Sequence, residues 1–223
     1  MTTIARDAGD GAVRAPATNR WLRPLLILTS AAAAATAAGS YADWLRVERL
    51  AALPAGTDFA AVHAETINAA DFPALFMALF FVAGAVLFAR WFMAAGRRVR
   101  ASGAQGLSIT PGWSVAGFFL PMLNLVLPFV AMREIWKSSG KPRDWEAQEI
   151  SWGVNLWWGA WLLANFAAGA SSIMNREPTD FGMFRSALLA DAVSASFLCA
   201  SGLLLAWLVE RVDRRLASLA GRL

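Results

Sequence analysis

The chain has 223 residues, of which 57% are hydrophobic and only 16% are charged, and its mean hydropathy is +0.46. An average soluble domain carries about 25% charged residues, so this composition excludes an ordinary water-soluble domain and predicts an integral membrane protein. A net charge of +4 and a pI of 10.2 would suggest nucleic acid as the partner of a soluble protein. Here the basic residues stand beside hydrophobic runs, a pattern typical of membrane orientation, and we expect no nucleic acid.

Residues 1–20 mix Ala, Gly, Asp and Arg without periodicity and predict a disordered cytoplasmic tail. The uncharged run 24–42 then predicts a first span, whose many small residues would let a neighbouring helix approach closely. The run also has the form of a signal peptide, because Arg20 and Arg23 precede it and small residues end it. Whether it is cleaved stays open, and in both cases the next residues lie outside.

A polar loop is predicted next, between Asp43 and Asp71. Apolar residues in 44–51 recur at helical spacing, which predicts a short amphipathic surface helix that ends before Pro54. The only histidine of the sequence, His63, lies in this segment without a second His or a Cys to share a metal. We expect it on the solvated surface.

Three further uncharged runs predict spans over residues 72–92, 152–174 and 188–209. Beyond the last run, residues 210–223 combine charges with apolar residues at helical spacing, which predicts a cytoplasmic amphipathic juxtamembrane helix. Cys199 lies inside the last run, and a single cysteine carries no redox or metal information.

The fifth hydrophobic run, residues 113–132, decides the topology. If all five runs cross, the 20 Lys and Arg residues divide 10 to 10, whereas 16 lie inside and 4 outside if this run enters and returns on one side. The second division is the one that the positive-inside rule expects. The predicted fold is therefore an all-α membrane domain, residues 21–209, of four transmembrane helices plus one Pro-broken re-entrant segment, with a fifth crossing as the alternative. Both termini are expected in the cytoplasm and the protein in the bacterial cytoplasmic (inner) membrane.

Two prolines break this fifth run. Pro121 disfavours helix at Leu120, and Pro128 cannot donate a hydrogen bond to the carbonyl of Asn124. The side-chain amide and the freed carbonyl of Asn124 both need partners when they leave water. Two interpretations stay open: a kinked, fully packed helix, or a polar cavity. The candidate cavity residues are Pro121, Asn124, Pro128, Asn155 and Asn165.

Aromatic and basic residues gather where the spans meet the predicted cytoplasmic interface, and such residues suit lipid head groups. The candidate interfacial and lipid-binding residues are Trp91, Arg97, Arg98, Arg100, Trp113, Arg133, Glu134, Trp136 and Lys137. We expect Glu134, which follows Arg133, to be an ion-paired boundary residue, and Asp191 to be interfacial.

These motifs resemble those of a known family of bacterial membrane proteins, domain of unknown function 4328. The resemblance covers roughly residues 72–219 and rests on Arg90-Trp91, residues 100–107, 111–115 and 119–121, Asn124, Pro128, residues 131–136, Trp157-Trp158 and residues 161–165. The chain departs from the family at Arg98, where Asn is frequent, and at Leu127, where a polar or basic residue is common. The resemblance implies the architecture and, as the family's name says, no activity.

No nucleophile with a base, no metal-ligand set and no pair of aspartates falls at membrane depth in this prediction, so we expect neither an enzyme nor a cofactor. The favoured function is a non-catalytic membrane component that binds other membrane proteins, a second copy of itself, or anionic lipid head groups. The alternative is a small channel or a lipid- or solute-handling transporter with its polar cavity between Pro121 and Pro128.

Overall fold

The computed structural model describes residues 19–51, 59–176, 178 and 180–221, with the backbone alone for 59–61 and 64–76. These residues form helices and no strand, as predicted. The elements are α1 (Asn19–Ala51), α2 (Phe59–Ala101), α3 (Pro111–Ala116), η1 (Gly117–Phe119), η2 (Leu123–Leu125), α4 (Leu127–Gly140), η3 (Pro142–Asp144), α5 (Trp152–Met174) and α6 (Phe181–Ala220). The predicted disordered tail lies outside the described residues, except that positions 19 and 20 already belong to α1.

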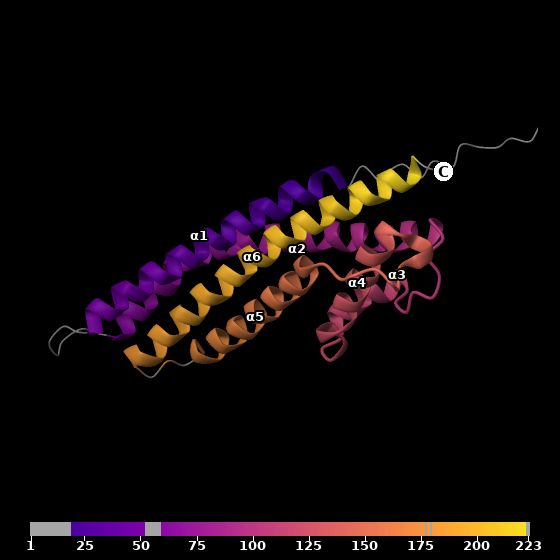
Figure 1. Ribbon diagram of the computed structural model, residues 1–223. Helices are drawn as coiled ribbons and strands as arrows, with labels where there is room; N and C mark the ends of the chain where they lie inside the picture. Colours follow the sequence, from indigo (N-terminus) through magenta and orange to yellow (C-terminus); the bar gives the residue numbers. More distant parts are fainter. Residues whose placement is uncertain (1–18, 52–58, 177, 179, 222–223) are drawn as a thin grey trace, which may run out of the picture.

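Helices α1 and α6 run antiparallel in one register along nearly the whole length of α1. At one end Arg23 pairs with Glu210 over 2.7 Å, and at the other Arg185 pairs with Glu48. A step of 25 residues along α1 thus matches a step of 25 residues back along α6, a shared length of about 37 Å. Figure 1 shows that α1 starts and α6 ends at the same end of the bundle, the end at which α2 also stops.

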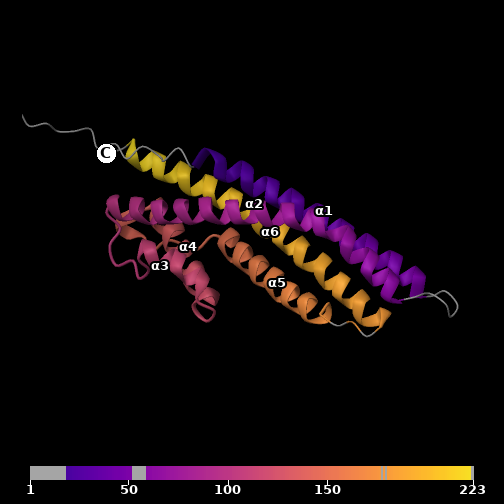
Figure 2. The same cartoon turned by 180° about the vertical axis from the view of Figure 1, so that it is seen from behind.

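Helix α2 runs parallel to α6, and α5 runs antiparallel to it. The ring of His63 meets Phe184 edge-on near the start of both helices, with centroids 4.7 Å apart. Further along, the indole Nε1 of Trp91 donates to the carboxylate of Asp213 over 3.1 Å. The Oγ atom of Ser194 on α6 donates to the carbonyl of Ala164 on α5 over 2.9 Å. Helix α6 therefore contacts the three other long helices, and Figure 2 shows the same arrangement from behind.

The middle of the bundle packs through small residues. A Cβ atom on Gly202 of α6 would collide with Ser30 of α1, so these two helices touch almost backbone to backbone. Buried alanines continue the pattern at Ala33, Ala164 and Ala195. Small residues permit such contacts between helices in lipid, where no hydrophobic effect drives helices together.

The helices continue past the points where the charges begin, which corrects three predictions. The predicted polar segment 43–71 is mostly helix, because α1 continues to Ala51 and α2 begins at Phe59; Pro54 lies outside the described residues. His63 is half-buried against Phe184 and does not stand on a solvated surface. The predicted juxtamembrane helix is the continuation of α6, which runs unbroken to Ala220. Ala, Arg and Glu are good helix formers, so a change of solvent does not end a helix.

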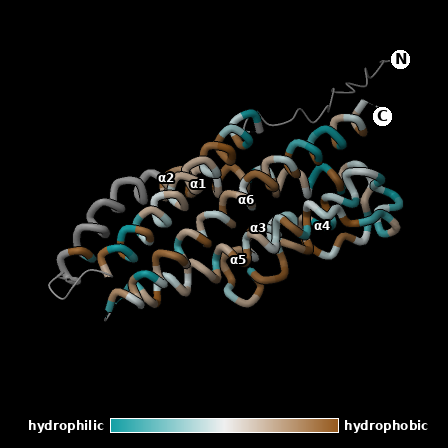
Figure 3. The backbone as a smooth tube through the Cα atoms, turned by 60° about the vertical axis from the view of Figure 1, so that its left-hand side comes forward, coloured by the Kyte–Doolittle hydropathy of each residue, from teal (hydrophilic) through white to brown (hydrophobic). Residues whose placement is uncertain are grey.

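In the described part of the chain, three helices are long and apolar enough to cross a membrane, namely α1, α2 from Met77, and α6. The α3–α4 segment makes a fourth only if its two halves, bent by 116°, count as one span. Helix α5 is not among the three, although its 23 residues carry no charge, because four tryptophans and two asparagines lower its hydropathy. Figure 3 shows hydrophobic helix in the middle of the bundle and hydrophilic segments at its two ends. These apolar helices fit a multi-pass membrane protein.

Candidate membrane-interface site

The segment between α2 and α5 folds back on itself as a hairpin of α3 and α4. Thr110 accepts a hydrogen bond from the Trp113 amide and Pro111 opens the helix, so α3 starts at a capped first turn. At its far end, a Cβ atom on Gly117 would lie 2.8 Å from the Cβ of Leu127, which opens α4. Only glycine lets the two arms come so close, and the hairpin therefore closes there.

The hairpin tip, residues 117–126, is broken where the two prolines predicted a break. Two 3-10 turns replace regular helix, and Pro128 stands in the first turn of α4, where a missing N–H costs nothing. The backbone N–H of Asn124 donates to the carbonyl of Leu120 over 2.7 Å. The side-chain Oδ1 of Asn124 is buried without a hydrogen-bond partner among the described residues. Pro121, in contrast, is exposed.

The two asparagines of α5 stand on its exposed side. Asn165 donates its amide to the carbonyl of Trp161 in its own helix over 2.7 Å, and Asn155 is exposed. The bond that joins α5 to the tip runs instead from the indole Nε1 of Trp158 to the carbonyl of Leu125, over 3.3 Å. No hydrogen bond in the described part of the chain joins Asn124 to Asn155 or Asn165, so the five candidate cavity residues do not form one hydrogen-bonded group.

An aromatic cluster holds the tip against the bundle. The ring of Phe118 packs edge-on against Phe88 of α2 and against Trp158 and Trp161 of α5, with centroids 5.9 to 6.5 Å apart. Trp158 and Trp161 stack on each other at 4.7 Å. Edge-to-face and offset-stacked rings at these separations are favourable. The tip is therefore fixed at the second and third turns of α5.

Glu134 fixes the loop that leads into the hairpin. Its carboxylate is 3% exposed and accepts the backbone N–H groups of Ser108 and Ile109, over 3.0 and 3.3 Å, together with the Ser108 hydroxyl. Arg100 donates to the carbonyl of Ile109 from the other side. No ion pair in the described residues includes Glu134, so the prediction that it is ion-paired is wrong. The Glu134 side chain is buried because its carboxylate accepts hydrogen bonds from two backbone N–H groups that would otherwise have no acceptor.

Two carboxylates of α6 connect this helix to α1 and α2 at the level of the hairpin. Asp213 accepts the Trp91 indole and lies 3.6 Å from the guanidinium of Arg98, and Glu210 pairs with Arg23 of α1. Sequence reasoning assigned neither carboxylate a role. Their spacing of three residues puts both on one face of α6 at the end of an apolar run, and this spacing could have indicated that they contact neighbouring helices.

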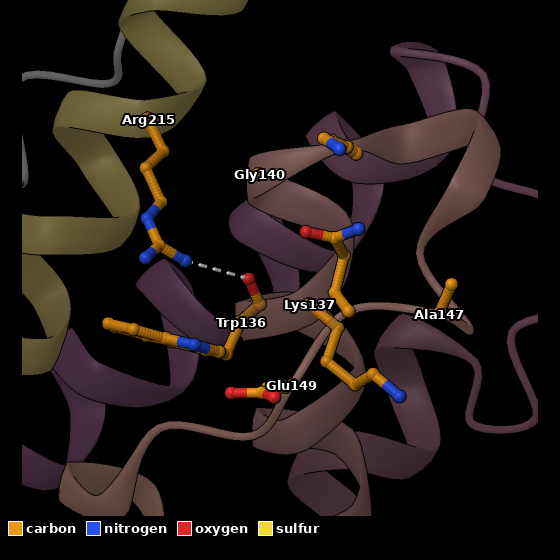
Figure 4. A pocket seen from close by; sticks show the side chains of 8 residues that line it. Trp136, Lys137, Gly140, Ala147, Glu149 and Arg215 are labelled. Atoms are coloured by element: carbon orange, nitrogen blue, oxygen red, sulfur yellow. Dashed lines mark hydrogen bonds between the residues drawn. The ribbon is translucent and has the colours of Figure 1, made fainter.

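A polar cleft of about 510 Å³ opens between the end of α4, the following loop and α6. Its lining residues are Trp136, Lys137, Gly140, Lys141, Ala147, Gln148, Glu149 and Arg215. The guanidinium of Arg215 lies 3.9 Å from the centre of the Trp136 ring and donates to the Trp136 carbonyl over 3.2 Å, as Figure 4 shows. Of the predicted interfacial residues, Trp136 and Lys137 line this cleft, and Arg215 and Lys141 were not predicted.

The remaining interfacial candidates surround the hairpin. Trp113 is 51% exposed at the start of α3, Arg97 is exposed on α2 and Arg133 is half-buried on α4. Within the described residues, no three His, Cys, Asp or Glu side chains lie close enough together to hold a metal ion.

The family model described as Domain of unknown function (DUF4328) matches residues 57–214, more than half of the chain. The chain belongs to this family. In this DUF4328 protein the motif residues meet around the hairpin: Trp91 and Arg100 on α2, Glu134 and Trp136 on α4, and Trp158 on α5. No curated protein and no solved structure matches the chain.

The two positions expected to depart from the family pattern, Arg98 and Leu127, each have a defined contact in the fold. Arg98 lies beside Asp213, so a cation at this position compensates a partly buried carboxylate. Leu127 presses on Gly117 at the closure of the hairpin, where an apolar side chain completes the packing between the arms.

Proposed function

We propose that this DUF4328 protein is a non-catalytic protein of the bacterial cytoplasmic membrane that inserts its α3–α4 hairpin into the cytoplasmic leaflet and binds anionic lipid at that face. The observation that carries the proposal is the exposed apolar tip of the hairpin. Phe119 is 81% exposed and Met122 is 83% exposed, on either side of Pro121. Burying such a side chain stabilises a protein by about 1.5–3 kcal/mol, so lipid is the favourable surrounding for this tip.

The depth of the tip supports entry into one leaflet. It contacts α5 at Trp158 and Trp161, and α5 begins at Trp152. Nine residues of helix rise about 13 Å, close to half of a hydrocarbon core of about 30 Å. A hairpin of this size reaches the middle of the bilayer without crossing it.

The orientation follows from the basic residues. The hairpin follows the end of α2, which lies at the end of the bundle where α1 starts and α6 ends, and 16 of the 20 Lys and Arg residues belong to that end under this topology. The positive-inside rule places such an end in the cytoplasm. The same cations attract anionic lipid, which is abundant at cytoplasmic surfaces.

Cysteine labelling of the membrane-embedded protein tests the topology. In a Cys199→Ala background, single cysteines replace Asp144 after α4, Arg176 after α5, and Phe119 at the tip. With a membrane-impermeant maleimide we expect Asp144→Cys to react only from the cytoplasmic side and Arg176→Cys only from outside. Phe119→Cys should react only after the bilayer is dissolved by detergent.

Labelling of Asp144→Cys from outside would overturn the proposal, because the hairpin would then cross the membrane. Rapid labelling of Phe119→Cys in the intact membrane would place the tip in water, which contradicts leaflet insertion. Gly112→Cys is the matched control, since the space around Gly112 is open and it lies at the start of α3, where we expect labelling from the cytoplasm.

A further inference from the structure

The cleft beside α4 carries more positive than negative charge. Lys137, Lys141 and Arg215 line it, against one carboxylate, Glu149. Among the ion pairs of the described residues, none includes these three cations. An ammonium has three donors and a guanidinium five, so the bonds of Lys137 to the carbonyl of Glu146 and of Arg215 to that of Trp136 leave donors free.

The cleft is built on a rigid aromatic stack. Trp207 of α6 stacks on both Trp136 and Trp152, each at 5.6 Å between centroids. Arg215 lies over the ring of Trp136. A cation held over a tryptophan ring is already oriented, so little ordering remains for a ligand to impose.

The same stack sets the depth of the cleft in the membrane. Trp152 is the first residue of α5 and is exposed, and the last uncharged stretch of α6 ends at Val209, just after Trp207. Tryptophans at the ends of spans lie at the level of lipid head groups. The cleft therefore opens where phosphates of the cytoplasmic leaflet lie, a level at which a soluble anion has no advantage over a lipid.

We propose that this cleft binds the phosphate of an anionic phospholipid head group through Lys137, Lys141 and Arg215. The inference rests on the proposed function, because it assigns lipid binding at the cytoplasmic face to one site. Arg215 supplies a planar donor pair for phosphate oxygens, and the two lysines supply mobile point charges at the rim.

The test compares lipids retained by the full-length protein in neutral detergent with an equal mixture of phosphatidylglycerol and phosphatidylcholine, counted by native mass spectrometry. The cleft variant carries Lys137→Gln, Lys141→Gln and Arg215→Gln. The control variant loses the same charge outside the cleft, through Arg20→Gln, Arg90→Gln and Arg143→Gln, all exposed positions. A basic residue near an anionic surface contributes about fivefold to binding, so the cleft variant should lose at least about tenfold in preference for phosphatidylglycerol, and the control should keep it.

The outcomes separate the two proposals. If the wild type shows no preference for phosphatidylglycerol, the proposed lipid function fails and the site fails with it. If the cleft and control variants lose the preference equally, the function stands as a diffuse charge effect and the site is overturned. The double variant Lys137→Gln/Lys141→Gln keeps the bond from Arg215 to Trp136, so a loss of preference at an unchanged Tm cannot come from unfolding.

A second arm distinguishes lipid from soluble phosphate. The protein in phosphatidylcholine nanodiscs receives either phosphatidylglycerol in the disc or millimolar glycerol 3-phosphate in solution, and its Tm is measured. We expect only the lipid to raise the Tm of the wild type, and not that of the cleft variant. An equal rise with glycerol 3-phosphate would assign the cleft to a soluble ligand and overturn the lipid assignment.

Discussion

Trp91 of α2 donates its indole N–H to the carboxylate of Asp213 of α6 over 3.1 Å, joining two residues that are 122 positions apart in the sequence. Trp91 is 2% exposed, and Arg98 lies on the other side of the same carboxylate. The bond connects the polar extensions of two long helices just where the hairpin packs on them.

We expect Asp213→Ala to lower the free energy of unfolding by about 1–3 kcal/mol, because a buried indole N–H and the Arg98 guanidinium lose their acceptor. Thermal unfolding in detergent, followed by size-exclusion chromatography, measures the effect. Asp144→Ala removes an exposed carboxylate and is the matched control. Equal Tm values for the two variants would show that the bond contributes nothing.

Glu134 makes a different kind of contribution, because it orders a loop. We expect Glu134→Gln to weaken the attachment of Ser108 and Ile109, since an amide NH₂ would face one of the two backbone N–H groups that the carboxylate now accepts. The loop between α2 and α3 should then exchange its amide hydrogens faster, which hydrogen-exchange mass spectrometry detects. Glu146→Gln, at an exposed position, should leave the exchange unchanged. Unaltered exchange in Glu134→Gln would assign the order of the loop to Arg100 alone.

The closure of the hairpin depends on Gly117. We expect Gly117→Ala to cost about 1–3 kcal/mol by overpacking, because the new Cβ would lie 2.8 Å from that of Leu127. Gly112→Ala, on the short helix α3 that precedes Gly117 but with open space around it, should cost far less. Leu127→Gly should cost less in the Gly117→Ala background than in the wild type, and strictly additive losses in Tm would contradict the close approach.

Part of this fold could be predicted from the sequence. The uncharged run 152–174 coincides with α5, and Pro121 and Pro128 marked the break in the hairpin. Hydropathy, however, marks where lipid ends, while helices end at caps. The sequence therefore predicted that α1, α2 and α6 cover fewer residues than they do. The caps were a usable signal, because Thr110, Ser151 and Asp180 accept hydrogen bonds at three helix starts and are residue types that favour this position.

The site was harder to predict, because its residues come from distant parts of the chain. Trp136 ends a recognisable motif and Lys137 follows it directly, but Arg215 joins them only because α6 runs 13 residues beyond Trp207. Asn155 and Asn165 pointed to a polar cavity by residue type alone. Residue type does not say which side of α5 faces the hairpin, and both asparagines are exposed.

The contact between Gly202 and Ser30 tests how closely α1 and α6 pack. A Cβ at position 202 would collide with the Ser30 hydroxyl, which donates to the carbonyl of Leu26 over 2.8 Å, whereas the Ser30 Cβ is 3.5 Å away. Alanine in a helix is favoured over glycine by about 1 kcal/mol. In the wild type we expect Gly202→Ala to give no such stabilisation, because the Ser30 hydroxyl must break its hydrogen bond to the Leu26 carbonyl to make room for the new Cβ.

In a Ser30→Ala background the hydroxyl is absent, and Gly202→Ala should become stabilising. A double-mutant cycle measured by thermal unfolding should therefore give a favourable coupling of about 1 kcal/mol between the two substitutions. Gly169→Ala on α5, where no atom lies within 4 Å of the added Cβ, should show no coupling to Ser30→Ala. Zero coupling at Gly202 as well would contradict the close contact between α1 and α6 at this point.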